Sequence, residues 1–497
     1  MYKQAAQFSK EATHDVFVIG LLKNGELDSG ASELNEIVNG QIGELKKQGL
    51  LSSDKGELRS FYTFGQAKTA TVYTIGLGNK NELDAQGIRD LVGKIGKKLN
   101  EDRVTDVAIS VDALQTDDIS VSELAFLIGE GLALSTYEVV DYKEKSNKPD
   151  KKVESVTLYT NASEDVVDAA EEGKAYAEGT NYARTLVNTP ANLLTPTDLA
   201  EEAQKLSERY GFKIEVLEEE DMKRLGMGAL LAVTAGSDQP AKMIVLTYQG
   251  TDKWENAIGL VGKGMTFDAG GVSLKPAAGM HEMKMDMGGA GAVLGAMESI
   301  GQLKPKVNVV AVIPSAENMI NGSALKPGDV IRAMTGKTIE IRNTDAEGRL
   351  ILADGVAYAR QLGVDYLVDV ATLTGAVVVA LGDYTTGAIT NNDAWMQKVT
   401  EASETAGEWI WQLPSHKPYK NMLKTSNVAD LNNAPGRAGG SITAGLFIGE
   451  FVENTPWVHL DIAGTAWQDK ATANGPAGAT GVMARTLTRL VSSHSAN

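Results

Sequence analysis

The segment NTDAEGRL, residues 343–350, places two carboxylates and a guanidinium at alternate positions directly before an apolar run. Asp345 can cap a helix, and Glu347 suits the first turn of the helix that LILADGVAYAR predicts. The same carboxylates, together with Arg349, could instead bind a metal ion or a substrate. Taken alone the pattern favours a capped helix start, so other segments must decide whether matching chemistry is present.

A second segment, VGKGMTFDAGGVSLKP at residues 261–276, holds Lys263, Asp268 and Lys275 among small residues. Its glycines would let the backbone come close to a ligand. The segment lacks the G-x-x-x-x-G-K-[ST] spacing of a phosphate-binding loop, because Met265 follows Gly-Lys-Gly. By itself it could equally be a turn whose charges face solvent.

A third segment, HEMKMDMGGAGAVLGAME at residues 281–298, misses the zinc motif H-E-x-x-H because Met285 takes the second histidine position. Asp286 stands before a small-residue helix start, where a carboxylate favours the helix dipole. The five histidines of the chain share no metal-ligand spacing, and no G-x-S-x-G segment for a serine nucleophile occurs. A histidine-built zinc site and a serine–histidine–acid triad are therefore disfavoured.

Taken together, the carboxylates of Asp268, Asp286, Asp345 and Glu347 predict a metal site. The segments that carry them follow predicted strands, and ligands of open α/β sheets bind beyond the carboxyl ends of the strands. Four carboxylates at one edge would repel each other, and divalent cations relieve that repulsion. Oxygen ligands without cysteine or histidine suit magnesium, manganese or zinc. Four carboxylates suffice for two metals about 3.5–4 Å apart, which together activate a hydrolytic water.

The whole chain limits the class of protein. At 497 residues it is too long for one ordinary core, which predicts two domains. No run of 18 apolar residues predicts a membrane span, and the N-terminus lacks the pattern of a signal peptide. The absence of cysteine is consistent with a cytoplasmic protein, and the net charge of −18 argues against nucleic-acid binding.

Strand and helix patterns predict a two-domain α/β protein. Residues 1–165 mix short β-rich runs with helical stretches, and residues 166–188 read as a connecting helix ended by proline steps. Residues 189–497 alternate strands with helices, and several strands, such as DYLVDVATL, are continuous apolar runs. Such runs predict a mixed, largely parallel central sheet covered by helices. We expect KTIEIRN, residues 337–343, to be another strand of this domain.

Five blocks of the second domain resemble the leucyl aminopeptidases, which are dinuclear cytosolic exopeptidases. VGKGMTFDAGGVSLKP, MKMDMGGA, NTDAEGRL, ATLTGA and HLDIAGTAW occur in the order and spacing of that family, and the match covers roughly residues 183–482. Ala269 stands where many relatives have serine, and Gly291 where alanine is frequent, but neither is a proposed ligand. The first 165 residues resemble the family only in size and α/β texture.

The resemblance implies a role for each matching residue. Two divalent ions, Mn²⁺ or Zn²⁺, would be held by Lys263, Asp268, Asp286, Asp345 and Glu347. Lys275 and Arg349 would be catalytic, with a bicarbonate at Arg349 that shuttles the proton. The pocket for the substrate side chain would be lined by Met283, Thr372, Leu373, Gly375, Ala463 and Ala466. The resemblance also implies a homohexamer acting on peptides with a free N-terminus, preferring leucine and other apolar residues.

The residue chemistry is consistent with this reading. A lysine binds a metal only as the neutral amine, and its ordinary pKa of about 10.4 would fall strongly beside two dications. A water bridging two metals becomes hydroxide near neutral pH and attacks the scissile carbonyl, while a protonated Lys275 would stabilise the oxyanion. Two alternatives stay open: a dinuclear phosphatase or amidase on the same carboxylates, and a nucleic-acid-binding role of the kind that some relatives have acquired.

Overall fold

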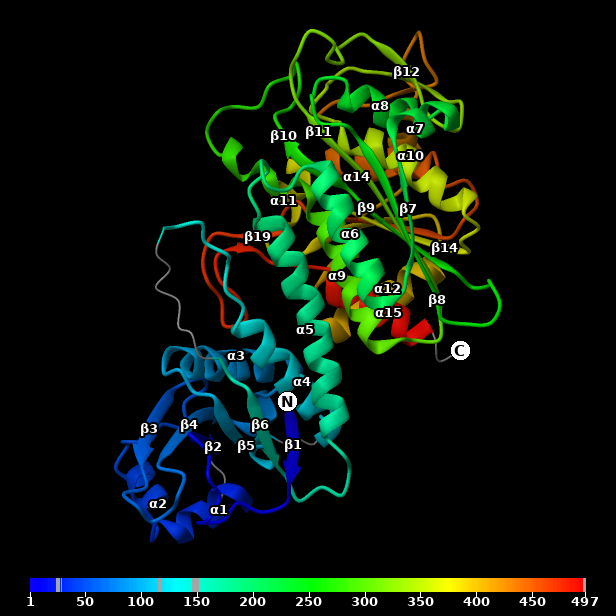
Figure 1. Cartoon of the computed structure of the whole chain (residues 1–497). Helices are drawn as coiled ribbons and strands as arrows, with labels where there is room; N and C mark the ends of the chain where they lie inside the picture. The colour runs from blue at the N-terminus through cyan, green and yellow to red at the C-terminus, as the bar shows by residue number, and fades with distance from the viewer. Residues whose placement is uncertain (24–26, 28, 115–117, 145–151, 495–497) are drawn as a thin grey trace. The chain divides into compact units, whose positions relative to one another are not determined.

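The chain forms two compact units in the computed structural model, which describes residues 1–23, 27, 29–114, 118–144 and 152–494 (Figure 1). One unit comprises Met1–Glu178 with Ala471–Pro476, and the other comprises Gly179–Lys470 with Ala477–Asn497. The division falls inside helix α5 (Val167–Asn188). Ala471–Pro476 belongs to the first unit despite its late position in the chain, and the Asn474 amide there donates to Asp90 at 2.7 Å. The three-part division drawn from the sequence stays a prediction.

The first unit contains a six-stranded sheet in the order β1-β6-β5-β2-β4-β3. All neighbouring strands are parallel except β3, which is antiparallel to β4. The strands are β1 Tyr2–Ala5, β2 Val16–Leu22, β3 Leu58–Tyr62, β4 Thr71–Gly78, β5 Asp106–Ser110 and β6 Ser155–Tyr159. The helices are α1 Ser29–Ile37, α2 Gln41–Lys47, α3 Ala85–Glu101 and α4 Val121–Ser135. Side-chain caps from Asp84 and Ser120 begin α3 and α4, as their residue types predict.

The second unit is built on a nine-stranded sheet in the order β16-β15-β18-β14-β9-β11-β8-β7, with β10 paired to β11. The central strands β18, β14, β9 and β11 are parallel, whereas β15, β8 and β7 are antiparallel to their inner neighbours. The strands are β7 Lys213–Leu217, β8 Lys242–Gln249, β9 Ile258–Gly262, β10 Gly264–Asp268, β11 Asn308–Asn318, β14 Tyr366–Ala371, β15 Thr386–Thr390, β16 Ile410–Gln412 and β18 Trp457–Asp461.

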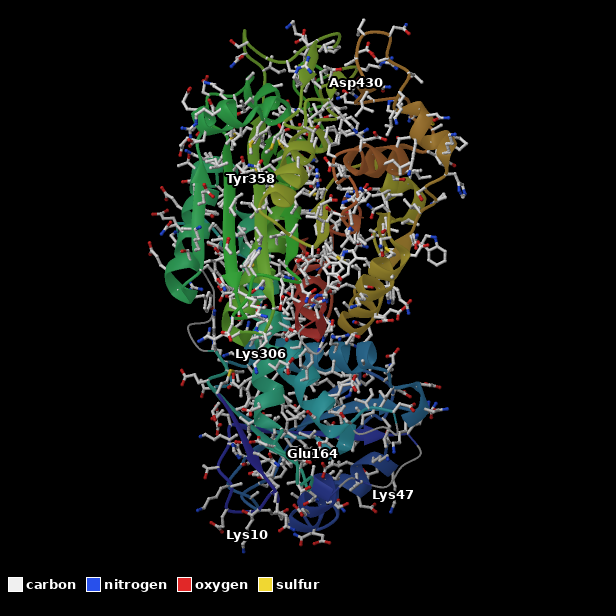
Figure 2. All side chains as sticks on the ribbon, turned by 90° about the vertical axis from the view of Figure 1, so that its right-hand side faces the viewer. Lys10, Lys47, Glu164, Lys306, Tyr358 and Asp430 are labelled. Carbon is white, nitrogen blue, oxygen red and sulfur yellow. The ribbon has the colours of Figure 1, made fainter. Side chains whose placement is uncertain are left out.

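Helices cover both faces of this sheet and form two separate cores. One core contains side chains of α6 Pro196–Tyr210, α9 Gly288–Leu303, α12 Asp393–Ala406 and α15 Ala484–His494. The other contains side chains of α7 Glu219–Leu225, α8 Gly228–Thr234, α10 Gly348–Gln361 and α14 Gly440–Gly449. Tyr358 on α10 belongs to the second core and is labelled among the packed side chains of Figure 2.

The two cores explain why most side chains of the central strands are apolar; among the polar exceptions, Asp369 of β14 and His459 of β18 hydrogen-bond each other at 2.6 Å. Val368 and Val370 of β14 contribute to the core of α9, whereas Leu367 and Ala371 contribute to the core of α10. Successive side chains of a strand point to opposite faces, so a strand covered by helices on both faces has no solvent-facing side. The predicted fold, a smaller N-terminal α/β part and a larger part with a mixed, largely parallel sheet, is confirmed.

The segment KTIEIRN contributes β13 (Thr338–Glu340), but this strand lies outside the central sheet. It pairs antiparallel with β12 (Val330–Arg332) and parallel with β17 (Leu431–Asn432) in a small three-stranded sheet. Only Ile339 of the three β13 residues is buried, which is too little apolar surface for a strand covered on both faces. NTDAEGRL therefore does not follow a strand of the central sheet. Within the described residues, no helix is both long and apolar enough to span a bilayer.

Candidate metal centre

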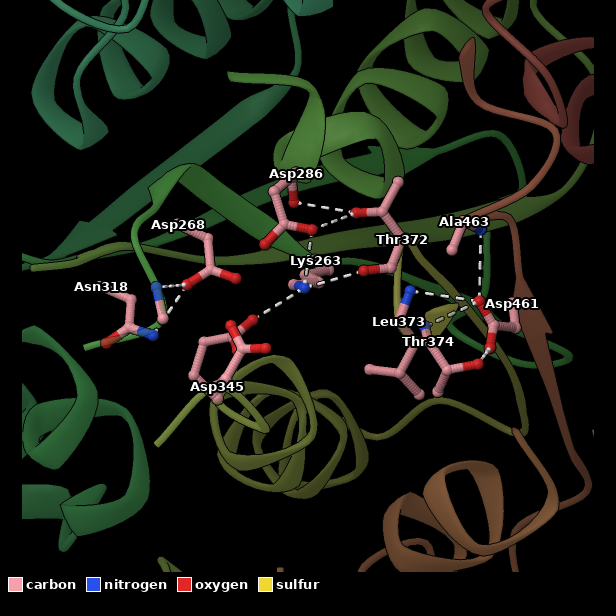
Figure 3. Close-up of polar contacts among 12 residues, drawn as sticks. Lys263, Asp268, Asp286, Asn318, Asp345, Thr372, Leu373, Thr374, Asp461 and Ala463 are labelled. Atoms are coloured by element: carbon pink, nitrogen blue, oxygen red, sulfur yellow. Dashed lines mark hydrogen bonds and ion pairs between the residues drawn. The ribbon is translucent and has the colours of Figure 1, made fainter. Parts of the chain in front are cut away.

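Residues from three segments of the sequence converge beyond the ends of the central strands. Lys263 follows β9, Asp268 ends β10, and Glu347 immediately precedes α10. Asp286 lies near the end of the 3-10 helix η3 (Met280–Met287), which leads into α9. Asp268, Asp286 and Glu347 are buried, and each offers one oxygen within 4.8 Å of the others (Figure 3).

Lys263 lies in the middle of this group. Its Nζ is 2.8 Å from Asp286 Oδ1 and 2.9 Å from Glu347 Oε1, and it donates to the Thr372 carbonyl at 2.8 Å. A Cβ on Gly348 would lie 2.7 Å from this Nζ, so the glycine of NTDAEGRL makes room for the lysine. Burial acts to lower the pKa of Lys263, but the nearby carboxylates outweigh it and raise that pKa.

Lys275 forms a second ion-paired group at the more exposed side of the site. Its Nζ lies 2.8 Å from Asp268 Oδ2 and 2.5 Å from Asp345 Oδ1. Both Lys275 and Asp345 are partly exposed, unlike the buried Lys263. Burial opposes the charge of Lys275, yet Asp268 and its neighbours raise the pKa of this ammonium above its usual value. Lys275 therefore stays protonated in the absence of metal.

Burial and mutual repulsion raise the pKa values of the Asp268 and Asp286 carboxyl groups at the site. Burial raises the pKa of Asp268, and the charge of Glu347 raises it further. Burial also raises the pKa of Asp286 well above its usual value, although Lys263 opposes the shift. Asp286 Oδ2 is buried and has no hydrogen-bond partner among the residues that the structure describes. Buried carboxylates of this kind, with one oxygen unsatisfied, fit divalent cations with oxygen ligands.

Asn318, which the sequence analysis missed, orients Asp268. Its Nδ2 donates to Asp268 Oδ1 at 2.8 Å and to the Thr344 carbonyl at 3.1 Å. The Gly270 N–H donates to the same Asp268 oxygen at 2.8 Å, which leaves Oδ2 for Lys275. The available signal was an asparagine that follows the apolar run VVAVIP of β11, at the strand end where the ligands were expected.

Arg349 lies in the first turn of α10 and is 9% exposed. Its Nη1 donates to the Asn433 carbonyl at 2.7 Å, and its Nε has no hydrogen-bond partner among the described residues. Burial lowers the pKa of Arg349 to about 10, even though Glu347 and Asp461 favour its charge. The guanidinium therefore remains cationic at neutral pH and can hold an anion but cannot accept a proton.

The expected pocket residues come partly together around Asp461, a second residue that the sequence analysis missed. Asp461 Oδ1 accepts hydrogen bonds from the N–H groups of Leu373 at 3.1 Å and Ala463 at 3.2 Å (Figure 3). Asp461 Oδ2 accepts the Thr374 hydroxyl at 2.6 Å. Asp461 ends β18 opposite Ala371 of β14, so a single carboxylate fixes the loops that follow two neighbouring strands. An acid ending an apolar central strand was the available signal.

The other pocket residues differ in how they lie. Thr372 donates its hydroxyl to Asp286 Oδ1 at 2.8 Å, so this expected pocket residue contacts the carboxylate cluster. A Cβ on Gly288 would lie 3.1 Å from Thr372 Cγ2 and 3.4 Å from Ala466 Cβ, so these two side chains face the same glycine. Gly375 is exposed at the start of α11 (Gly375–Leu381), and Met283 is half-buried on η3.

Comparisons with known proteins identify the family that the chain resembles. The family model described as "Cytosol aminopeptidase family, catalytic domain" matches residues 181–488, and the one described as "Cytosol aminopeptidase family, N-terminal domain" matches residues 18–146. A Bacillus subtilis protein named "Probable cytosol aminopeptidase" is 50% identical over 477 residues, which is 96% of this chain and 95% of that protein.

Solved structures resemble the chain over nearly its whole length. A mutant of tomato leucine aminopeptidase has a TM-score of 0.87 and 32% identity, covering 99% of this chain and 96% of that one. The bottromycin maturation enzyme BotP, in complex with Mn, has a TM-score of 0.86 and 34% identity, covering 97% of this chain and all of that one.

Proposed function

The chain belongs to the cytosol aminopeptidase family, and we propose that the cluster around Lys263 is the two-metal site at which it cleaves peptides. It is a metal-dependent aminopeptidase of the leucyl aminopeptidase type. The observation that carries the proposal is the convergence of three buried carboxylates, with oxygens within 4.8 Å of one another, beside the partly exposed Asp345. The five proposed ligands come from three separate segments, residues 263–268, 286 and 345–347, which only the fold brings together.

The proposed metal ligands are Lys263, Asp268, Asp286, Asp345 and Glu347. Mn²⁺ or Zn²⁺ suits this donor set, and a structural relative, BotP, is described in complex with Mn. Two such ions would act as Lewis acids that polarise the scissile carbonyl and make a water nucleophilic near neutral pH. Lys263 can join the donor set only after losing the proton that now pairs with Asp286 and Glu347.

Lys275 and Arg349 carry the other proposed roles. Lys275 keeps its proton and points an ammonium toward Asp268 and Asp345, where it would stabilise the oxyanion that develops on the carbonyl. Arg349 cannot act as the general base because it stays cationic. We propose that its Nε, which has no hydrogen-bond partner in the described part of the chain, helps to hold a bicarbonate that moves the proton. The guanidinium supplies the positive charge that such an anion needs in a buried place.

The substrates are peptides, and we propose that they must present a free N-terminus with a leucine-like side chain. Asp268 would lie near the α-amine, and the side chain would enter the pocket of Met283, Thr372, Leu373, Gly375, Ala463 and Ala466. These residues bring no charge to pair with an acidic or basic side chain. The names of the relatives support a cytoplasmic location, and the family resemblance supports a homohexamer.

Two substrates separate this function from a dinuclear phosphatase on the same carboxylates. We expect the purified protein to hydrolyse leucine p-nitroanilide, to lose that activity with a chelator, and to leave p-nitrophenyl phosphate intact. Arg349 is the only arginine in the NTDAEGRL motif, and a single guanidinium offers few hydrogen-bond donors to a phosphate group. Faster hydrolysis of the phosphate monoester than of the anilide would overturn the proposal.

A further inference from the structure

The segment that carries Asp345, Glu347 and Arg349 is held along one side by a single distant residue, Asn433. We infer that Asn433 is a positioning residue: it does not touch a metal or substrate but fixes the backbone from which the proposed ligands and the guanidinium project. The inference rests on the proposed two-metal function and adds to it a residue that none of the motifs indicates. Asn433 directly follows β17 and is fully buried.

Both ends of the Asn433 amide bind the NTDAEGRL backbone. Its Oδ1 accepts the Arg342 N–H at 2.8 Å and the Asn343 N–H at 3.4 Å. Its Nδ2 donates to the Asn343 carbonyl at 2.6 Å and to the Ala346 carbonyl at 3.3 Å. Asn343 and Ala346 enclose Asp345, and Ala346 immediately precedes Glu347. The amide therefore fixes the backbone from which the side chains of Asp345 and Glu347 extend.

The backbone of Asn433 extends the same contact in both directions. Its N–H donates to the Glu340 carbonyl at 3.1 Å, at the end of β13. Its carbonyl accepts Nη1 of Arg349 at 2.7 Å, in the first turn of α10. One residue thus binds the chain from Glu340, before the motif, to Arg349, near the end of the motif.

The motif is also held by the Asp268 segment and by Asn318. The Thr344 hydroxyl donates to the Gly270 carbonyl at 2.7 Å, and the Thr344 carbonyl accepts a hydrogen bond from Asn318. Asn433 binds the same backbone at Asn343 and Ala346, on either side of Asp345. Without its amide, two carbonyls of the motif and the N–H groups of Arg342 and Asn343 would lose a buried partner, and we expect this backbone to shift to satisfy them. Outer partners that orient metal ligands typically change metal affinity 10–100-fold when they are removed.

The neighbouring residue offers a matched control. Asn432 is also an asparagine and is equally buried, but its Nδ2 donates to the Met422 and Leu423 carbonyls and to the Thr425 hydroxyl. None of these partners belongs to the metal centre. Replacing Asn432 removes a similar number of buried hydrogen bonds without touching the NTDAEGRL backbone.

The experiment compares Asn433→Ala, Asn433→Asp and Asn432→Ala with the wild type. Calorimetric titration of Mn²⁺ into each metal-free protein measures affinity without relying on turnover, and kcat and KM for leucine p-nitroanilide are then measured at saturating Mn²⁺. We expect Asn433→Ala to weaken Mn²⁺ binding by about 10–100-fold and to lower kcat more than it raises KM. Asn432→Ala should lower the melting temperature by a similar amount but stay within about twofold of the wild type in Mn²⁺ affinity.

Asn433→Asp keeps the shape and the acceptor half of the amide but removes both donors, so it tests the inference if the alanine variant does not fold. We expect it, too, to weaken Mn²⁺ binding. If a folded Asn433 variant binds Mn²⁺ as tightly as Asn432→Ala, the positioning role is wrong while the proposed function stands. If the wild type binds no Mn²⁺, the proposed metal site itself fails and the inference with it.

Discussion

Lys263 Nζ lies 2.9 Å from Glu347 Oε1, although the lysine follows the central strand β9 and the glutamate precedes helix α10. A buried ammonium so placed neutralises part of the charge of the carboxylates around it. The carboxylates still outnumber the lysines, and Asp286 Oδ2 has no partner among the described residues. The arrangement is consistent with a site in which cations complete the charge balance.

Metal removal should abolish activity. The carboxylates of the site have too few cationic partners in the protein alone, so we expect dialysis against a chelator to give a folded, inactive protein. Mn²⁺, Zn²⁺ or Co²⁺ should restore turnover, and titration calorimetry should resolve two binding events of unequal affinity, because one set of ligands is more exposed than the other. Full activity in protein shown by metal analysis to be metal-free would contradict the dinuclear mechanism.

Lys275→Ala and Glu347→Ala should fail in different ways. Lys275→Ala removes an oxyanion partner, so we expect it to keep its metals and to lose kcat by roughly 10²–10³. Glu347→Ala removes a buried carboxylate of the metal cluster, so both metal content and turnover should fall. Metal analysis beside kcat distinguishes the two. A Lys275→Ala protein that releases metal but turns over normally once refilled would show that the roles are misassigned.

Substrate selectivity should depend on a free α-amine and on an apolar side chain that fits the uncharged pocket. Each buried methylene contributes about 0.8 kcal/mol, so leucine p-nitroanilide should exceed the alanine compound by about one to two orders of magnitude in kcat/KM. The aspartate compound should be poorer than leucine because no cation lines the pocket. Acetyl-leucine p-nitroanilide tests the need for a free amine. Comparable cleavage of this blocked compound would refute an exopeptidase, and a preference for aspartate would refute the proposed pocket.

Asp354 should make stability depend on pH. Its Oδ2 accepts the N–H groups of Ala229 and Leu230, its Oδ1 accepts that of Met334, and burial raises its pKa from 3.8 to about 7. A raised carboxyl pKa contributes stability that is fully present below the unfolded value and is lost as the pH rises through the folded value. The free energy of unfolding of the wild type should therefore fall, relative to that of Asp354→Asn, by on the order of 2 kcal/mol between pH 5 and pH 8.

Urea unfolding of both metal-free proteins at each pH measures this difference, because other titrating groups contribute equally and cancel. The asparagine variant will differ by a constant amount from its altered hydrogen bonds, so only the slope with pH counts. Parallel pH curves for the two proteins would rule out the titration of Asp354 as the cause.

Two glycines of α9 should differ sharply when changed to alanine. A Cβ on Gly289 would lie 2.0 Å from the Val370 carbonyl, which is backbone of the central strand β14. A Cβ on Gly291 would lie 2.8 Å from Val187 Cγ2, a side chain that can shift. Gly289→Ala should lose about 3 kcal/mol or more of stability, whereas Gly291→Ala should change it by less than about 1 kcal/mol. Thermal unfolding compares them, and equal melting temperatures would contradict the close approach of α9 to β14.

The sequence alone predicted the α/β architecture and the segments that hold the candidate chemistry. Both are local properties: the apolar run of β9 predicts a strand covered on both faces, and NTDAEGRL keeps its charged residues within a few positions of one another. The sequence was less informative for KTIEIRN, because a strand of only three residues does not show that it joins a separate sheet. The sheet that accepts a short strand depends on partners elsewhere in the chain.

Only the tertiary structure decided which residues support the site. Asn318 orients Asp268, Asp461 fixes the loops of Leu373 and Ala463, and Asn433 binds the motif at Asn343. Each of these side chains reaches a backbone or carboxylate that is distant in sequence, across a contact that exists only once the strands have paired. A buried amide or carboxylate leaves no periodic signal of its own, because its partners are chosen by the fold and not by its neighbours along the chain.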